Sequence, residues 1–214
     1  MPEITFVAKQ FFQVSSDAEP VSPENNKTFL KEEVLLTSEI HCFLTNFYES
    51  LAATDIWLAT KLLTEEEIKP CPATGLDDLA EADMANVCET GVAWLIEPLH
   101  VGAIQKFSGT LNHKLKAPTT RLAATVNTFI HFVYHFSQKS LVLCDVQTMK
   151  ARIKGEPKSM IFDPMAHTPK GKSGPGDHGR DRIKNFLATH RCNSKCETLG
   201  LDELNSDDEE SDKE

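Results

Sequence analysis

The sequence contains no run of about 18 apolar residues, so none of its segments is predicted to span a membrane. Its first residues lack the basic stretch and following apolar stretch that mark a secretory signal peptide. The six cysteines are therefore expected in a reducing compartment, where metal binding or burial is more common than a disulfide. No internal repeat is present. These absences indicate a soluble, cytoplasmic protein.

Positive charge is scarce and unevenly placed. The chain has 22 Lys and Arg against 32 Asp and Glu, for a net charge of −10. Residues 150–195 nevertheless carry eleven basic residues against four acidic ones, whereas residues 202–214 carry eight acids and one lysine. This pattern favours a locally held anionic ligand over a nucleic-acid surface, although a solvated basic loop explains the charge equally well. The tail is too charged to fold alone.

Hydrophobic periodicity predicts a mixture of helices and strands. Two of the expected helices and the loop between them are the most informative for the site. One amphipathic helix is expected over 119–136, and a final helix over about 180–189. Residues 148–160, with four basic residues, Gly155 and Pro157, are expected to form an exposed loop. The remaining expectations are strands at 4–12, 91–99 and 140–146, a helix over 28–51 and a mostly irregular stretch at 64–90.

Three residues after the last predicted helix have the spacing of metal ligands. His190, Cys192 and Cys196 fall within one short segment, and such spacings allow a single turn to supply several ligands to tetrahedral zinc. The fourth ligand must come from elsewhere, and His131 on the amphipathic helix is a candidate. Considered alone, a helical histidine is more often a core residue, and the three clustered residues are also compatible with an unrelated surface segment.

A glycine-rich segment precedes the final helix. Gly174, Gly176 and Gly179 form a G-x-G-x-x-G pattern with Asp177 inside it. A dinucleotide-binding fingerprint requires a preceding strand and an acidic residue about 20 positions further on. Neither is convincing here, so a flexible loop is the default interpretation.

Two carboxylates and an amide form another candidate site. Asp145 and Gln147 are two positions apart at the end of a predicted strand, so their side chains point to the same face. With Asp163, which lies in a segment of apolar residues and proline, they would suit Mg²⁺. Considered alone, each acid is more often a solvated or capping residue than a metal ligand. Lys9 lies in an apolar strand, where its charge needs an anionic partner or must reach the strand end.

Several blocks occur in an order that resembles the alpha-type (atypical) protein kinases over about residues 5 to 201. The blocks are F-V-A-K at 6–9, W-L-I-E-P at 94–98 followed by G-A-I-Q-K-F at 102–107, the helix segment 124–134, L-V-L-C-D-V-Q at 141–147, F-D-P-M-A-H-T at 162–168, G-x-G-D-x-G at 174–179 and F-L-x-x-H-x-C-N-x-x-C at 186–196. The blocks from Ala124 onward are the most specific.

The resemblance implies an α+β, two-lobed protein-kinase-like fold with ATP between the lobes and a zinc-stapled C-lobe. Residues 1–99 would form a partial N-lobe and hinge, 100–201 the C-lobe, and 202–214 a disordered acidic tail. The zinc ligands implied by the resemblance are His131, His190, Cys192 and Cys196. This zinc would be structural.

The implied activity is serine/threonine phosphorylation of a protein substrate with ATP and Mg²⁺. Asp145 would orient or deprotonate the acceptor hydroxyl, and Gln147 and Asp163 would hold Mg²⁺. The implied nucleotide contacts are Lys9 at the phosphates, Glu97 at the hinge near the adenine and Lys106 in the phosphate region. The glycine segment, with Gly174, Gly176, Asp177 and Gly179, would face the protein substrate.

The chain departs from the family pattern at several places. Only eight residues precede Lys9 in this sequence, so the N-lobe is expected to lack the family's phosphate-covering strands, as in a natural truncation, a wrongly assigned start or a fragment. Asp145 and Asp163 are 18 residues apart, a longer spacing than the family's, with a basic segment inserted between them. An acid at Asp177, in place of the family's asparagine, could repel an acidic substrate or bind a second cation. The alternative function is a catalytically impaired pseudokinase that acts as a zinc-stapled protein-binding module.

Overall fold

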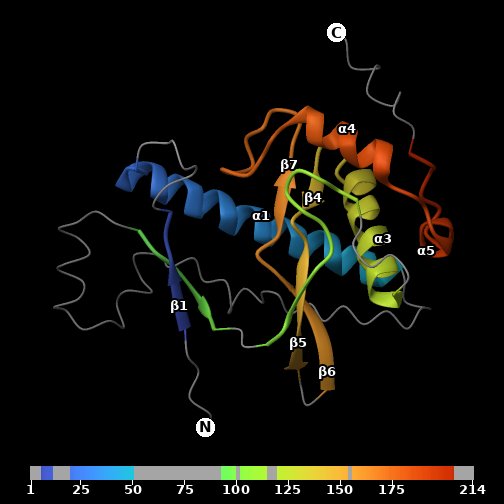
Figure 1. Cartoon of the computed structure of the whole chain (residues 1–214), viewed down its shortest axis with the longest axis horizontal. Helices are drawn as coiled ribbons and strands as arrows, with labels where there is room; N and C mark the ends of the chain where they lie inside the picture. Colours follow the sequence, from blue (N-terminus) through green and yellow to red (C-terminus); the bar gives the residue numbers. More distant parts are fainter. Residues whose placement is uncertain are drawn as a thin grey trace. The chain divides into compact units, whose positions relative to one another are not determined.

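The structure, a computed structural model, describes residues 6–11, 20–50, 93–99, 102–114, 120–153 and 156–204. The chain divides into two compact units, one made of residues 1–38 and 63–101 and the other of 39–62 and 102–214. Figure 1 colours the elements along the sequence, from β1 in blue to α5 in red. The expected segment 64–90 lies outside the described residues.

The first unit contains one pair of strands and the start of a long helix. Strand β1 (Phe6–Lys9) pairs antiparallel with β2 (Leu95–Pro98), so that Lys9 lies opposite Leu95. Both strands are shorter than expected, and β2 ends at Pro98, which cannot continue a ladder. The buried Asn26 accepts a hydrogen bond from the Phe11 N–H (2.8 Å) and donates one to the Ala93 carbonyl (2.7 Å), which joins α1 to this unit.

Helix α1 spans Pro23–Ser50 and begins five residues before the expected start at position 28. Proline is favoured at the first helical position, because its missing N–H would be unpaired there in any case. The Ser22 hydroxyl accepts a hydrogen bond from the Asn25 N–H (3.2 Å), so Ser22 caps the helix. Thr28 is an interior residue whose hydroxyl bonds back to the Glu24 carbonyl (3.1 Å).

The core of the second unit is built around α3 (Arg121–Phe136), and this helix was expected at nearly the same bounds. The Thr120 hydroxyl caps it by accepting from the Ala123 N–H. The Phe47 ring from the end of α1 packs on the rings of Phe129 and Phe132, with centroids 5.2 and 5.3 Å apart. Five apolar residues recur along α3 at helical spacing. Four of them are buried, namely Val126, Phe129, Ile130 and Val133, and the fifth, Leu122, is half-buried.

Two strand ladders complete this unit. Strand β4 (Val142–Cys144) is fully buried against α3 and pairs antiparallel with β7 (Met165–His167). Strand β3 (Ile104–Lys106), β5 (Gln147–Ile153) and β6 (Glu156–Phe162) form a second sheet in that order. Figure 1 shows β4 beside β7, and the β5–β6 hairpin extending away from them.

The prediction of an exposed loop at 148–160 is wrong, because this segment belongs to the β5–β6 hairpin. Thr148, Met149, Ser159 and Met160 are each buried. Met149 lies opposite Met160 in the register and clusters with Phe162.

The misleading signals in this segment were its basic residues and Pro157. Lys150 lies opposite Ser159 and its ammonium donates to the Ser159 hydroxyl (2.7 Å), so one charge has a cross-strand partner. Pro157 lies on β6, which ends the strand order of its sheet within the described residues, and proline within sheets is confined mainly to such edge strands.

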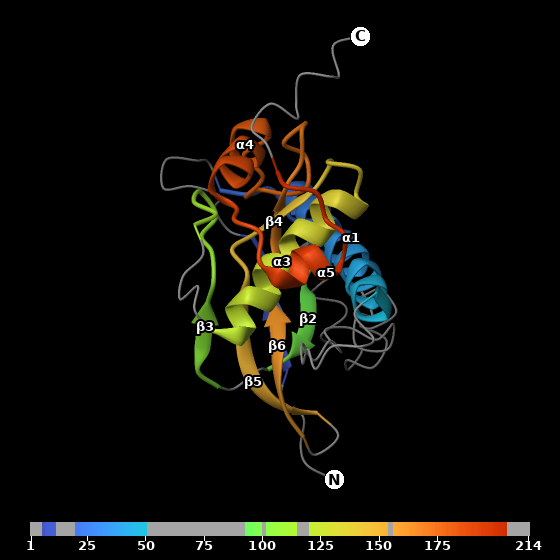
Figure 2. The same ribbon diagram turned by 90° about the vertical axis from the view of Figure 1, so that its right-hand side faces the viewer.

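Helix α4 spans Arg180–Thr189, as expected, and a short helix that was not expected, α5, follows at Ser194–Thr198. Figure 2 shows α5 against α3, and α4 contacts β7. None of the helices within the described residues combines the length and the apolar character that crossing a bilayer requires.

The buried His113 makes the stability of the second unit sensitive to acid. Its ring packs edge-on against His167 and Phe186, and neither ring nitrogen has a hydrogen-bond partner within the described residues. Burial, and then the neighbouring His167 and Arg182, lower the pKa of His113 from 6.5 to about 4. Only the unfolded chain therefore gains this proton as the pH falls between those two values.

We expect the free energy of unfolding to fall by up to about 3 kcal/mol between neutral pH and pH about 4 through this one group. Urea denaturation at a series of pH values measures it. His113→Phe should flatten the dependence, whereas the exposed His178→Gln should not. An unchanged slope in His113→Phe would assign the acid sensitivity to other groups.

Candidate functional site

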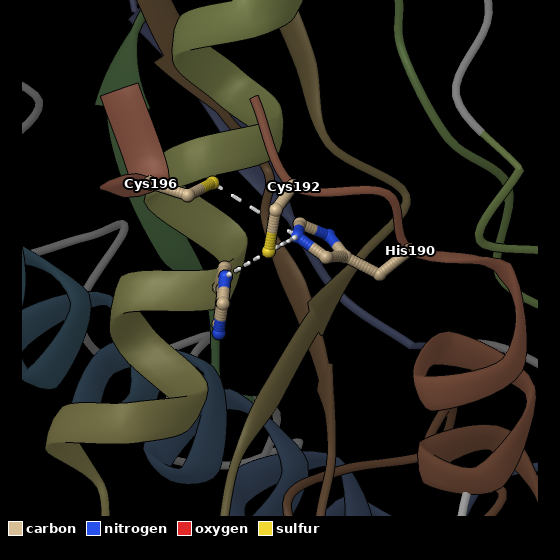
Figure 3. A group of neighbouring side chains, drawn as sticks. His190, Cys192 and Cys196 are labelled. Carbon is tan, nitrogen blue, oxygen red and sulfur yellow. Dashed lines mark hydrogen bonds between the residues drawn. The ribbon is translucent and has the colours of Figure 1, made fainter. Parts of the chain in front are cut away.

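Four side chains with metal-binding atoms converge at one end of α3. His131 comes from α3, His190 follows α4, Cys192 lies in the next loop and Cys196 is on α5. Their ligand atoms all lie within 4.8 Å of one another. The Cys192 sulfur is 3.7 Å from His131 Nδ1 and 3.6 Å from His190 Nε2. Figure 3 shows His190, Cys192 and Cys196 pointing toward one common point. The structure thus brings all four predicted ligands together.

The protonation of these groups suits a bound cation. Burial, and then the nearby His135, lower the pKa of His131 to about 4, with Asp202 opposing the shift. Burial, and then His131 and Arg191, lower the pKa of His190 to about 3. Both imidazoles are therefore neutral and offer lone pairs. Burial and the adjacent Cys196 raise the pKa of the Cys192 thiol to about 11. The thiol is therefore protonated at neutral pH and would lose its proton when it binds a metal cation.

Two asparagines join this ligand loop to α3 through hydrogen bonds. The Asn193 amide donates to the Ala124 carbonyl (3.2 Å), and its oxygen accepts from the Thr128 hydroxyl (3.0 Å). The same oxygen accepts from the Lys195 N–H and so caps α5. Asn127 donates to the Arg191 carbonyl (2.9 Å). The sequence signal for Asn193 is its place directly before a helix, where asparagine is a favoured cap.

Asp145 and Asp163 lie at a break between two antiparallel ladders. One ladder ends with Cys144 opposite Met165, and the other begins with Gln147 opposite Phe162. Two residues on each side fall between these pairs, Asp145–Val146 on one strand and Asp163–Pro164 on the other. The β5–β6 hairpin accounts for the 18-residue spacing between Asp145 and Asp163, because its second strand returns the backbone to the ladder break.

Both acids have a left-handed backbone. The φ angle is 50° at Asp145 and 45° at Asp163. This conformation is uncommon outside glycine, although aspartate is among the residues that tolerate it, and it persists where the surroundings over-determine it. Hydrogen bonds from the segment after β3 provide such surroundings. The Phe107 N–H donates to the Val146 carbonyl (2.8 Å), and the Val146 N–H donates to the fully buried Ser108 hydroxyl (3.2 Å). Sequence analysis gave no signal for Ser108.

A basic residue contacts the first of these acids. The Lys106 ammonium lies 2.5 Å from Asp145 Oδ1, and Lys106 is opposite Gln147 in the β3–β5 register. The ion pair joins Lys106 to Asp145, and the register places Gln147 opposite both Lys106 and Phe162, the residue before Asp163. In the other unit, Lys9 and Glu97 lie on the paired strands β1 and β2.

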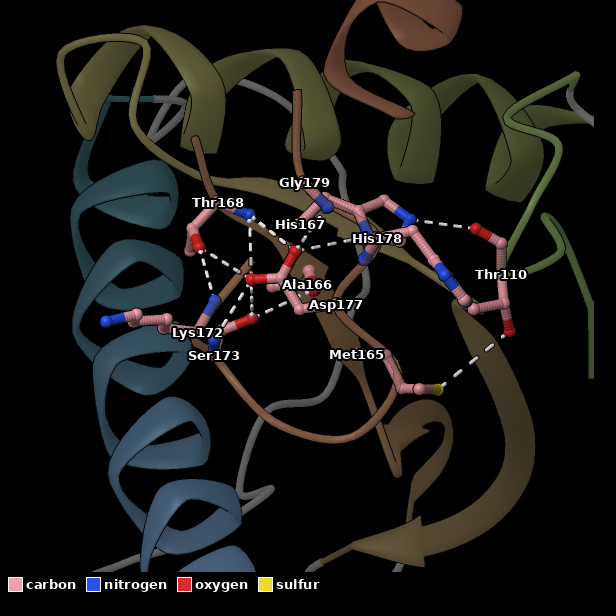
Figure 4. A network of polar contacts seen from close by, with 10 residues as sticks. All are labelled: Thr110, Met165, Ala166, His167, Thr168, Lys172, Ser173, Asp177, His178 and Gly179. Atoms are coloured by element: carbon pink, nitrogen blue, oxygen red, sulfur yellow. Dashed lines mark hydrogen bonds and ion pairs between the residues drawn. The ribbon is translucent and has the colours of Figure 1, made fainter. Parts of the chain in front are cut away.

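The glycine segment is organised around the carboxylate of Asp177, as Figure 4 shows. Asp177 Oδ2 accepts from the Thr168 hydroxyl (2.5 Å) and the Ser173 N–H (2.9 Å), and Oδ1 accepts from the Gly179 N–H (2.9 Å). Burial alone would raise the pKa of Asp177, but the contacts with His167, Thr168, Gly179 and Ser173 hold it well below its usual range. Its side chain has no exposed surface, so it is not available to repel a substrate or to bind a cation.

His167 on β7 fixes the base of this segment. Its Nε2 lies 2.8 Å from the Thr110 carbonyl, and its Nδ1 lies 3.1 Å from the His178 N–H. The Thr110 carbonyl only accepts hydrogen bonds, so His167 Nε2 carries a proton in this contact. The segment 168–179 is thus hydrogen-bonded to β7 and within itself.

These features define an α+β domain with a two-histidine, two-cysteine cluster and two aspartates at a break between its strand ladders. A model of the Alpha-kinase family matches residues 2–196. Myosin heavy chain kinase A from Dictyostelium discoideum is 36% identical over 108 residues, 50% of this chain and 8% of that protein. Transient receptor potential cation channel subfamily M member 6 from Mus musculus is 27% identical over 196 residues, 85% of this chain and 9% of that protein.

Solved structures show the same fold. The C-terminally truncated alpha-kinase domain of myosin heavy chain kinase superposes with a TM-score of 0.58 and 23% identity, and covers 89% of this chain and 64% of that one. The alpha-kinase domain of myosin heavy chain kinase A in complex with AMP gives a TM-score of 0.56 and 24% identity over 88% and 63% of the chains. The chain belongs to the alpha-kinase family, whose fold it shares as the sequence predicted, and it spans less than a tenth of the two relatives named above.

The hydrogen bonds of Asp177 generate a stability prediction. Asp177→Asn places an NH₂ group where the native oxygen accepts N–H and O–H donors, so at least one buried donor loses its acceptor. We expect a loss of about 1–3 kcal/mol in the free energy of unfolding, measured by urea denaturation. Asp181→Asn, at an exposed position in the first turn of α4, should change it by less than about 0.5 kcal/mol. Equal effects of the two substitutions would contradict the role given to Asp177.

Proposed function

We propose that the chain transfers the γ-phosphoryl group of ATP to a serine or threonine hydroxyl of a protein substrate. The observation that supports this most directly is the meeting of Asp145 and Asp163 at the ladder break, with Lys106 beside them. Family membership supplies the reaction class. Catalysis of this kind depends mainly on positioning and charge neutralisation, which a cluster of two acids, an amide and a lysine can provide.

Each residue of the cluster has a role in this proposal. Asp145 orients the acceptor hydroxyl and takes its proton, while the Lys106 ammonium fixes the direction of the Asp145 carboxylate. Gln147 and Asp163 offer the oxygen atoms that Mg²⁺ prefers. Bound Mg²⁺ would neutralise charge on the phosphates. The left-handed backbone at Asp145 and Asp163 sets the direction of both carboxylates before substrate arrives.

The proposed nucleotide contacts come from the strand pair of the first unit and from β3. Lys9 would contact the phosphates, Glu97 would lie at the hinge near the adenine, and Lys106 would contribute in the phosphate region. The alpha-kinase domain of myosin heavy chain kinase A forms complexes with AMP and with AMP-PNP, which supports nucleotide binding by this family. The segment 174–179 would face the protein substrate.

His131, His190, Cys192 and Cys196 would hold a structural zinc ion. Two neutral imidazoles and two sulfurs form a donor set that zinc binds tetrahedrally, with no position left open for a substrate. Bound zinc would join α3 to α4 and α5, and its binding free energy would add to the stability of the fold.

Removal of the Asp145 carboxylate tests the catalytic proposal. Asp145→Asn keeps the size of the side chain but cannot accept the substrate proton, so we expect phosphate transfer to fall by at least about 100-fold. Radiolabelled ATP and a peptide substrate that contains serine and threonine provide the assay. Glu39→Gln, an exposed acid on α1, is the matched control and should retain full transfer.

Two outcomes would contradict this proposal. Equal transfer by the Asp145→Asn variant would assign the activity to a contaminant or to other residues. No ATP binding at millimolar concentrations of ATP and Mg²⁺, with a folded and metal-loaded chain, would support the pseudokinase alternative, in which the domain only binds other proteins.

Metal analysis tests the zinc proposal. We expect one zinc ion per chain by elemental analysis and its loss in Cys192→Ser and in the double variant His131→Ala/His190→Ala. Cys42→Ser, an exposed cysteine on α1, should retain the metal. Chelation should lower the melting temperature of the native chain, since the ion binds only the folded state. Zinc retained by the double-histidine variant would overturn this ligand assignment.

A further inference from the structure

Two glycines of the segment 168–180 contact each other through their backbones. A Cβ atom added to Gly171 would lie 3.8 Å from both the Cα and the backbone nitrogen of Gly179, and one added to Gly179 would lie 3.9 Å from the Gly171 nitrogen. Both residues have a left-handed backbone, with φ of 64° and 70°, which glycine adopts without strain. The backbone therefore passes close to itself at these two glycines, although they are eight positions apart in the sequence.

The residues on either side of both glycines are basic. Gly171 is flanked by Lys170 and Lys172, and Gly179 by His178 and Arg180. All four flanking residues are exposed. Within the described residues, the ammonium groups of the two lysines and the guanidinium of Arg180 have neither a hydrogen bond nor an ion pair. We name these four residues the glycine-crossing cluster.

The Asp177 carboxylate forms no exposed ion pair with the glycine-crossing cluster. Both Asp177 oxygens face inward to donors of the segment itself, and the side chain has no exposed surface. In Figure 4, the Lys172 side chain points away from this carboxylate. Asp181, in the first turn of α4, is the exposed acid nearest in sequence. Residues 168–184 hold five Lys and Arg against two acids, so the outward charge is predominantly positive.

We propose that the glycine-crossing cluster recognises an anionic side chain of the protein substrate, so that the kinase prefers serine or threonine acceptors flanked by acidic residues. This inference rests on the proposed function for the acceptor, and it assigns a substrate class to the segment. The recognised group is a carboxylate or a phosphate, since ammonium and guanidinium groups bind both.

The hydrogen bonds described above prepare the cluster for such a partner. The Asp177 carboxylate, the Thr168 hydroxyl and His167 hold the backbone of the segment, so the cations are displayed on a fixed loop. Fixed cations lose less freedom on binding than cations on a mobile loop. Exposed ion pairs are individually weak and are screened by salt, so the preference should come from several charges together and should decline at high ionic strength.

Peptides with one acceptor serine test the proposal, with flanking positions filled by Asp and Glu, by Asn and Gln, by Lys and Arg, or by Asn and Gln with one phosphoserine. We expect kcat/KM to be about fivefold or more higher for the acidic than for the neutral peptide at low salt, and lowest for the basic peptide. The ratio between the phosphoserine and the carboxylate peptides identifies which anion the cluster prefers. A higher kcat/KM for the neutral or basic peptide would overturn the proposal.

Charge removal on the segment provides the second arm. The double variant Lys170→Ser/Lys172→Ser should reduce the acidic-to-neutral ratio to near unity, and Arg180→Ser alone should lower it by a smaller factor. Lys27→Ser/Lys31→Ser removes two exposed lysines from α1 and should leave the ratio unchanged. A ratio unchanged in both cluster variants, with normal far-ultraviolet circular dichroism, would also overturn the proposal.

A binding measurement separates this inference from the proposed function. Fluorescence anisotropy of a labelled acidic peptide requires no phosphate transfer. If no peptide is phosphorylated but the acidic peptide binds the native chain and not Lys170→Ser/Lys172→Ser, the cluster is supported and the kinase activity is not. Equal binding of acidic and basic peptides would refute the cluster, whatever the transfer assay shows.

Discussion

The second unit depends on an antiparallel pairing that is interrupted for two residues on each strand. On one side of the interruption Cys144 pairs with Met165, and on the other Gln147 pairs with Phe162. Within it the backbone turns left-handed at Asp145 and at Asp163, and the segment after β3 supplies the hydrogen bonds that the ladder has lost. The strain at these two residues is tolerable because buried strands and paired backbone groups fix the chain on both sides. The backbone conformation at these two residues therefore sets the direction in which each side chain leaves the chain.

The same strands connect this cluster to the two other sites of the unit. Strand β7 begins two residues after Asp163 and ends at His167, whose ring bonds the segment that carries the glycine-crossing cluster. Strand β4 ends directly before Asp145 and packs on α3, which carries His131. The metal-ligand cluster is therefore connected to the acids through one helix–strand contact. Under the proposed function, the acids carry the chemistry and the metal ligands hold α3, α4 and α5 together.

Local patterns in the sequence predicted the helices and the metal ligands well, because periodicity and ligand spacing are short-range signals. α3 and α4 have nearly the expected bounds, and the four ligand residues meet as the family resemblance implied. The hairpin at 148–160 could not be predicted, since the burial of Met149 and Met160 depends on a cross-strand register. Ser108 was missed for the same reason. Its hydroxyl bonds a residue 38 positions away, and no local pattern reports such a contact.

Asp177 shows most clearly how placement changes the meaning of a charge. In the sequence it is an acid within a basic stretch, and it lowers the formal net charge of that stretch. In the structure its carboxylate accepts hydrogen bonds from its own loop and has no exposed surface, while the basic neighbours of Gly171 and Gly179 are exposed. The neutral donors stabilise the buried anion without removing its charge. Asp177 therefore still contributes to the electric field outside the loop, but an approaching anionic partner can contact only the exposed cations.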